Sequence, residues 1–537
     1  MTVVANGTIV DGTGRPAFRG HVVVERDRIA AVEACGEGAG AEREARRLAG
    51  AADAVIDASG CLVTPGFIDS HAHSDAYLVV EPDASSKISQ GVTTEINGQC
   101  GGSAAPRFGE ARLSSDWASV LGPRLAWRSM AEYRTTIEDV RPAVNTVQFV
   151  GHNTLRSSVM GYAAREAAED ELREMRRLLE RSLDEGGWGL STGLIYQPGR
   201  YSSPREVLEL AKAASLRGGF YATHMRSEGD RLLEAIDEVI ELAAATGIRA
   251  EISHLKTSGR ANWHKIDAAL EKIDRAVGDG LLLGSDRYPF CAAGTDLDIV
   301  LPDWAQEGAA KAECERLADP AMRARIADEI DASGRDWSTV MIGGTWTQEN
   351  REYQGRTISG ILSRMSMASG TASAASPGRL VCDILARDRC RTGAFFFGMC
   401  EENLEKILSR PWTTPGSDAS LRAPWGPLGK DHPHPRAYAT MPEFYRRVRA
   451  LGFTREESIA RMTSVPARRF GLKGRGTLEK GTFADIAVWR EDAFRAAATY
   501  TDPHRFTAGM ECVMVNGATP YRNGRFTGDR AGRFLER

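Results

Sequence analysis

The alternation of apolar and polar positions divides the chain into two β-rich ends and a longer middle region. Residues 1–64 alternate short β-rich runs such as 7–10 with turn residues. Near the other end, 481–489 and 513–517 have the same character. Asn516-Gly517 is a strong signal for a β-hairpin turn. We therefore expect the two ends to complete one small sheet, with the middle region folded between them.

The middle region repeatedly places a short apolar strand before or after an amphipathic helix. Residues 144–150 read as a strand, and a helix from about 232 to 245 is followed by a strand at 248–253. This alternation predicts parallel βαβ units, arranged either as a closed barrel or as an open doubly wound sheet. Residues 295–345 interrupt the rhythm and read as an insertion.

Composition and charge exclude several classes of protein. The chain has 537 residues, 42% apolar and 26% charged, with a formal net charge of −4. These ordinary values indicate neither a nucleic-acid partner nor a membrane partner. No apolar run approaches the ~20 residues that a membrane helix needs. The nine cysteines have no paired spacing, so we expect a cytoplasmic protein in a reducing compartment, with an oligomer left open.

The strongest chemical signal is an apolar strand at 66–69 that leads into His71 and His73. In a strand, positions i and i+2 lie on one face, so both imidazoles could bind a single metal ion. The alternative is two surface histidines. Active sites of barrels lie at the C-terminal ends of the strands, which favours the metal site.

Three further residues also follow β-rich runs. His224 ends the run 220–224 and His254 ends 251–254, so both could reach the same ion from successive strands. Cys100 follows 92–99 and precedes a glycine pair. Its thiolate could be a zinc ligand or a nucleophile, although a single cysteine is more often a small buried hydrophobe.

Two identical Gly-Ser-Asp triplets offer a catalytic carboxylate, one ending at Asp286 and the other at Asp418. Metal-assisted hydrolysis needs one carboxylate that takes a proton from water and passes it to the leaving nitrogen. Chemistry alone does not choose between the two aspartates. The phosphate-binding motifs GxGxxG after a strand and GxxxxGK[ST] are both absent.

Several motifs in order along the chain resemble the amidohydrolase superfamily, and within it the D-aminoacylases (N-acyl-D-amino-acid deacylases). Besides the strand that leads into His71 and His73, the discriminating matches are Gly98-Gln99-Cys100-Gly101, Gly151-His152-Asn153-Thr154-Leu155-Arg156, Leu190-Ser191-Thr192-Gly193-Leu194-Ile195-Tyr196, Ser253-His254-Leu255-Lys256 and Asp286-Arg287-Tyr288-Pro289. The resemblance implies an α/β fold with a TIM-type (β/α)8 barrel at 65–465, a small β-sandwich-like domain from 1–64 plus 466–537, and an insertion in the barrel at about 295–345.

The resemblance also implies roles for the candidate residues. Cys100 would join His224 and His254 around a tightly held zinc ion. His71 and His73 would line a weaker or vacant second position with Asp418, the catalytic residue, and Asp286 would belong to the substrate-side Tyr-Pro motif instead. Water activated by zinc and Asp418 would attack the acyl carbonyl, and Asp418 would then protonate the departing amine.

The implied substrate is an N-acyl-D-amino acid. Lys256 lies two residues beyond His254 and could bind the substrate carboxylate as a point charge, or remain a solvated lysine. Tyr196 and Tyr288 are further candidates for binding the carboxylate or the carbonyl. Ser74 and Leu255 depart from the usual motifs. The alternatives are a dihydropyrimidinase-like or xenobiotic amidase on the same fold and, more remotely, a non-catalytic scaffold.

Overall fold

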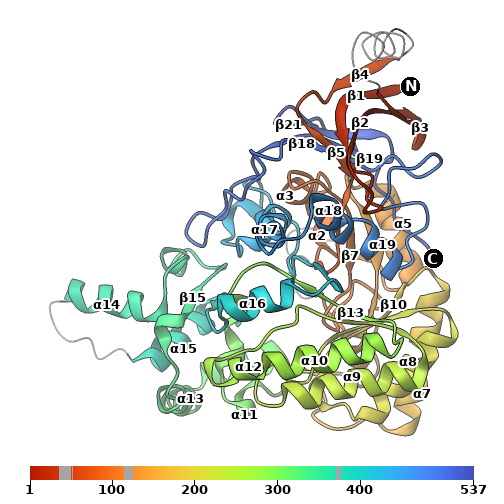
Figure 1. The fold of residues 1–537 in the computed structure, drawn as a ribbon. Coiled ribbons are helices and arrows are strands. Elements are labelled where there is room, and N and C mark those ends of the chain that lie inside the picture. The colour runs from red at the N-terminus through yellow and green to blue at the C-terminus, as the bar shows by residue number, and fades with distance from the viewer. Residues whose placement is uncertain (36–49, 51, 114–124, 370–375) are drawn as a thin grey trace.

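The middle region forms a closed parallel barrel (Figure 1). The structure, a computed structural model, describes residues 1–35, 50, 52–113, 125–369 and 376–537. The barrel strands, in spatial order, are β6 (Phe67–Asp69), β7 (Val92–Asn97), β8 (Asn145–Gln148) continued by β9 (Val150–Gly151), β10 (Gly189–Gly193), β11 (Phe220–His224), β12 (Arg249–Ile252), β13 (Leu283–Arg287) and β17 (Thr413–Pro415).

The first and last strands of the barrel are in contact, which excludes an open sheet. The amide of Ser70, just after β6, donates to the carbonyl of Pro415 at 3.0 Å. A parallel bridge between Ala72 and Ala419 continues this contact. The choice that periodicity left open is therefore decided by pairing between residues more than 300 positions apart.

Helices between the strands cover the outside of the barrel, as the alternating pattern predicts. The helix expected at 232–245 is α9 (Leu232–Thr246), which ends at Gly247 in the left-handed conformation. The other covering helices are α5 (Met130–Val140), α6 (His152–Met160), α7 (Glu169–Asp184), α8 (Pro204–Leu216), α10 (Ile266–Gly278), α16 (Glu401–Leu408), α17 (Arg436–Ala450) and α18 (Arg455–Met462). Among the described residues, no helix combines the length and apolar character needed to cross a membrane.

The two ends of the chain share one sheet, drawn at the top of Figure 1. Its strands are β1 (Thr2–Ile9), β2 (Phe18–Glu25), β3 (Arg28–Ala34), β4 (Ala54–Asp57), β5 (Leu62–Pro65), β18 (Ile486–Trp489), β19 (Met510–Val515), β20 (Ala518–Arg522) and β21 (Arg525–Phe526). Antiparallel pairing of β18 with β5 joins the ends. The hairpin predicted at Asn516-Gly517 is confirmed, because both residues have positive φ between β19 and β20.

The insertion after β13 is larger than the sequence predicted. Its sheet consists of β14 (Ala293–Asp296), β15 (Val340–Ile342) and β16 (Gly393–Phe396), and its helices are α11 (Asp303–Gln306), α12 (Ala309–Ala318), α13 (Pro320–Ala332), α14 (Ile358–Ser369) and α15 (Pro377–Asp388). The expected limits of 295–345 were too short, because β16 returns to pair with both β14 and β15. The insertion has a hydrophobic core of its own and projects to the left in Figure 1.

A buried ionic cluster ties the first, second and last strands together beneath the histidines. Lys87, from the short helix α3 (Ser85–Ile88), lies with its Nζ 2.7 Å from Asp69 Oδ2 and 2.9 Å from Glu95 Oε1. The same nitrogen donates to Ser417 Oγ at 2.8 Å. These side chains are fully buried and hold the ends of β6, β7 and β17 at fixed positions.

Candidate metal centre and active site

All the predicted ligands lie at one edge of the barrel. Parallel strands present their C-terminal ends on the same side, where barrel active sites are found. The residues concerned are His71 and His73 after β6, Cys100 after β7, His224 at the end of β11, His254 after β12 and Asp418 after β17. Strand closure thus brings together residues from five strands.

One group consists of Cys100, His224 and His254, whose ligand atoms all lie within 4.8 Å of one another. Cys100 Sγ is 3.3 Å from His254 Nε2. His224 is only 4% exposed, yet neither of its ring nitrogens has a hydrogen-bond partner among the described residues. A buried imidazole without partners needs an explanation, and a bound metal ion supplies one.

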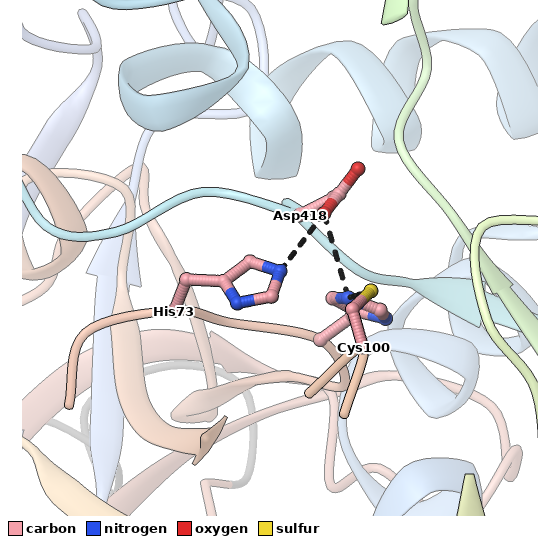
Figure 2. A group of neighbouring side chains, drawn as sticks. His73, Cys100 and Asp418 are labelled. Carbon is pink, nitrogen blue, oxygen red and sulfur yellow. Dashed lines mark hydrogen bonds and ion pairs between the residues drawn. The ribbon is translucent and has the colours of Figure 1, made fainter. Parts of the chain in front are cut away.

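A second group adjoins the first at the sulfur of Cys100. It contains His71, His73, Cys100 and Asp418, again with ligand atoms within 4.8 Å. Figure 2 shows His73 and Asp418 facing each other, with His73 Nε2 3.1 Å from Asp418 Oδ1. His71 Nε2 lies 3.4 Å from the same oxygen. The arrangement therefore offers two neighbouring metal positions that share one thiol.

The electrostatics of the site favour the anionic forms of the Cys100 thiol and the Asp418 carboxyl. Burial raises the pKa of the Cys100 thiol, but His71 and His254 outweigh burial and hold that pKa well below its usual range. Burial likewise raises the pKa of Asp418, whereas Arg436 and His254 hold it well below the ordinary carboxyl value. Both groups are consequently negative at neutral pH, as a metal ligand and a proton acceptor must be.

Three of the candidate residues adopt the left-handed backbone conformation. The φ angles are 52° for Cys100, 37° for His254 and 50° for Asp418. Each such residue costs about 1–3 kcal/mol, and residues of this kind cluster at active sites. Hydrogen bonds fix two of these turns, because His254 N donates to Asp286 Oδ1 at 2.9 Å and Asp418 N donates to His71 O at 2.8 Å.

The structure corrects the expectation for Asp286. The resemblance placed it on the substrate side, but its Oδ2 lies 3.1 Å from Nδ1 of His71. It therefore contacts the ring nitrogen that faces away from Asp418 and fixes the orientation and tautomer of His71. The aspartates of the two Gly-Ser-Asp triplets thus have different positions. Asp418 belongs to the second ligand group, whereas Asp286 contacts the opposite side of the His71 ring.

Sequence reasoning missed Glu228 and Arg436. Glu228 Oε1 lies 2.9 Å from His254 Nδ1, and its Oε2 lies 3.6 Å from His224 Nε2. Arg436 Nη1 donates to Asp418 Oδ2 at 2.8 Å. The only sequence signal was that Glu228 follows His224 by four residues; nothing marked Arg436, which begins an ordinary amphipathic helix.

The predicted substrate residues lie close to these ligands. The ring of Tyr196 lies edge-on to His224 with centroids 4.9 Å apart. Tyr288 is fully buried, and its hydroxyl has no hydrogen-bond partner among the described residues. Lys256 is engaged rather than solvated, because its Nζ forms an ion pair with Glu228 and lies 2.7 Å from His254 Nδ1.

A cavity of about 630 Å³ opens beside the second group. His73 and Asp418 line it on the barrel side, and residues of the insertion line the opposite side. This volume is typical of a small-molecule site. The nitrogen, sulfur and carboxylate donors at its edge are those that zinc prefers, so the residues present fit that ion.

Comparisons with known proteins agree with this geometry. Residues 54–521 match the model of the amidohydrolase family. An N-acyl-D-glutamate deacylase from Alcaligenes xylosoxydans xylosoxydans is 33% identical over 100% of this chain and 96% of its own length. A solved structure of D-aminoacylase, from a study of its binuclear metal center, superposes on this chain with a TM-score of 0.80. The two sequences are 31% identical, and the match covers 100% of this chain and 99% of the other.

A second solved structure is an N-acyl-D-glutamate deacylase from Bordetella bronchiseptica, in complex with zinc and a phosphonate that mimics the tetrahedral intermediate. It superposes with a TM-score of 0.77, at 30% identity, covering 100% of this chain and 99% of the other. The family match spans most of the chain, and the relatives match over their whole length. The chain therefore belongs to the amidohydrolase family and has its barrel fold with an additional domain.

Proposed function

We propose that this protein is a zinc-dependent enzyme that hydrolyses the amide bond of N-acyl-D-amino acids and releases a carboxylic acid and a D-amino acid. The observation that carries the proposal is the pair of ligand groups that meet at Cys100, at the edge of a cavity. The relatives that match over their full length deacylate N-acyl-D-amino acids according to their names, which supports the same substrate class.

We propose that Cys100, His224 and His254 hold one zinc ion tightly, and that His71, His73 and Asp418 form a second, weaker position. The unpartnered nitrogens of His224 support the first assignment. When bound, zinc supplies a Lewis acid that polarises the acyl carbonyl and makes water more acidic. Because both positions share the Cys100 thiolate, an ion in the first position would reduce the negative charge available to a second ion, which favours unequal occupancy.

Asp418 is the proposed catalytic base and acid. Its carboxylate, kept ionised by Arg436, accepts the proton of the attacking water. The protonated carboxyl then donates that proton to the departing amine nitrogen, which completes the proton balance of hydrolysis. Arg436 donates a 2.8 Å hydrogen bond to Oδ2 of Asp418 and so restricts the rotation of that carboxylate. The other oxygen, Oδ1, consequently points toward His71 and His73.

We propose that Tyr196, Tyr288 and Lys256 bind the substrate. The hydroxyl of Tyr288 has no hydrogen-bond partner among the described residues, so it is a donor available to a carbonyl or carboxylate oxygen. Lys256 would contribute positive charge while it stays paired with Glu228, so its role depends on a small rearrangement when substrate enters. We also propose a cytoplasmic location, supported by nine cysteines that form no disulfide among the described residues. Recovery of the protein outside the cytoplasm would contradict it.

The proposal is tested by zinc content and turnover of the same preparation. Purified protein should contain about one tightly bound zinc per chain and hydrolyse members of a panel of N-acetyl-D-amino acids in preference to their L-enantiomers. Zinc without turnover of any panel member would overturn the substrate class and point to cyclic or xenobiotic amides. Protein that binds no metal would overturn the mechanism.

A further inference from the structure

A second cavity, of about 610 Å³, lies at the opposite end of the barrel from the metal centre. One of its walls is formed where strands begin, because Phe220 and Arg249 are the first residues of β11 and β12. Phe220 precedes His224 on β11, and roughly 13 Å of strand separates this wall from the metal ligands. The cavity is therefore separate from the one beside Asp418.

The opposite wall comes from segments that follow the barrel in the sequence. The short helix α19 (Ser464–Arg469) and the loop after it form most of this wall. A Cβ built on Gly471 of that loop would lie 3.3 Å from Nη1 of Arg249. This glycine lies between Arg468 and Lys473 in the sequence. The guanidinium of Arg249 therefore lies beside the segment that carries these two cations.

The charged side chains of the lining are all positive, and the described residues that line the cavity include no acidic side chain. They are Arg249, Arg468, Lys473, Arg475 and Arg537. Arg475 is already paired, because it contacts Asp485 and donates to Asn516 Oδ1 at 2.9 Å. The other four form no ion pair with a carboxylate in the described part of the chain. Four positive charges thus line the cavity without counterions.

Two less exposed groups of the lining also lack a complementary partner. Ser464 is 2% exposed, and its Oγ has no hydrogen-bond partner among the described residues. Arg537 is partly buried and donates to neutral backbone carbonyls, those of Arg217 and Leu183. Burial, opposed in part by the charge of Asp184, lowers the pKa of Arg537. A bound anion would supply an acceptor for the hydroxyl and a counterion for the guanidinium.

Neither a purely structural role nor a nucleic-acid partner accounts for this lining. Residues at the N-terminal end of a barrel usually stabilise the fold, but cations without counterions repel one another. The positive charges line a cavity rather than an extended surface, and the chain has a formal net charge of −4. A cavity of this volume is typical of a small-molecule site.

The number of positive charges favours a phosphate group over a single carboxylate. A phosphate monoester carries about −1.5 to −2 charges at pH 7 and has three acceptor oxygens. Guanidinium groups bind such oxygens through paired hydrogen bonds, and a lysine adds a point charge. Ala467 and Leu472 provide apolar surface beside the cations. The lining therefore matches a small phosphate ester.

We propose that this cavity binds a small phosphorylated metabolite, whose phosphate group is held by Arg249, Arg468 and Lys473. The site lies apart from the metal centre, so the inference does not depend on the proposed deacylase function. Arg537 and the hydroxyl of Ser464 would complete the set of donors around the ligand.

Calorimetric titration of the zinc-loaded protein tests this proposal, with phenyl phosphate and glucose 6-phosphate as probes and phenyl sulfate as the singly charged control. We expect saturable binding of a phosphate probe with Kd below about 1 mM, and binding of the sulfate that is about tenfold weaker. Arg468→Gln and Lys473→Gln should each weaken phosphate binding about tenfold. Arg173→Gln, at an exposed arginine of α7, is the matched control and should leave the affinity unchanged.

Each outcome decides the inference. No saturable binding of either phosphate probe, or equal binding of phenyl sulfate and phenyl phosphate, would overturn it. Equal affinity in wild type, Arg468→Gln and Lys473→Gln would place the anion elsewhere and overturn it as well. Both residues are exposed, so the urea midpoint of each variant should match wild type; if a variant does not fold, the wild-type comparison of phosphate with sulfate still decides. Failure of the deacylase proposal would leave the result standing, since no readout uses turnover.

Discussion

Two buried polar clusters at the same edge of the barrel differ in how completely their groups are paired. In the lower cluster, Lys87 Nζ contacts Asp69, Glu95 and Ser417 within 3.0 Å. In the upper cluster, neither ring nitrogen of His224 has a hydrogen-bond partner among the described residues, although Nε2 lies 3.6 Å from Glu228 Oε2. In the lower cluster the Lys87 ammonium balances the charge of Asp69 and Glu95, although Glu95 Oε2 has no hydrogen-bond partner among the described residues. This cluster serves the fold, whereas a bound metal ion would complete the upper one.

Backbone conformation shows the same contrast. Cys100, His254 and Asp418 in the upper cluster have positive φ, while Asp69, Lys87 and Glu95 below them do not. Strained backbone persists where the surrounding structure forces it, and it is found mainly at functional sites. Substitutions in the lower cluster should therefore change stability, and substitutions in the upper cluster should change metal binding or turnover.

The largest effect is expected from Lys87→Met. Removing the ammonium leaves two fully buried carboxylates without a counterion, which should lower the free energy of unfolding by about 3–5 kcal/mol. Urea denaturation followed by tryptophan fluorescence measures it. Lys212→Met, at an exposed lysine, is the matched control and should change stability by less than about 1 kcal/mol. Equal losses in the two variants would contradict the structural role of the lower cluster.

Asp418→Asn should act on turnover instead. Loss of the proton acceptor should reduce kcat by about 10³-fold, equivalent to about 4 kcal/mol in the activation barrier. Steady-state kinetics with an N-acetyl-D-amino acid measures the change, while the urea midpoint should move far less than in Lys87→Met. A variant that keeps more than a tenth of wild-type kcat would exclude Asp418 as the base.

Metal removal should sharpen the contrast further. Zinc at about 100 times its dissociation constant should stabilise the folded protein by about 2.7 kcal/mol relative to chelated protein. Thermal unfolding with and without a chelator measures this difference. Because His224 lies in the proposed tight site, His224→Ala should abolish most of the zinc-dependent shift; an undiminished shift would place the ion elsewhere.

The smallest effect is expected from Glu228→Gln. Glu228 contacts His254 Nδ1 and pairs with Lys256, so it orients a ligand without binding the metal itself in our assignment. Zinc affinity should fall about 10–100-fold, as is typical for such partners. Competition with a chromophoric chelator measures affinity, and Glu209→Gln on the surface of α8 serves as control. Unchanged zinc affinity would show that Glu228 pairs with Lys256 without orienting His254 for metal binding.

The sequence was informative where chemistry depends on local spacing. His71 and His73 at i and i+2, and the strand-end positions of Cys100, His224 and His254, identified five residues that the fold brings together. It singled out Asp286 but not its contact with His71, and it did not mark Glu228 or Arg436, because a charged residue carries no local sign of the group it will contact. Their roles depend on contacts formed only after the barrel closes.

The sequence by itself determined the alternation of strands and helices, the shared sheet of the two ends and the strand-end positions of the ligands, because these follow from side-chain periodicity and turn chemistry within short segments. The family resemblance added a closed barrel and Asp418 as the catalytic carboxylate. Only the tertiary structure showed the pairing that closes the barrel, the contact of Asp286 with His71, and an insertion that extends from β14 to β16. These outcomes rest on pairing between segments far apart in the chain, whose register no local pattern encodes.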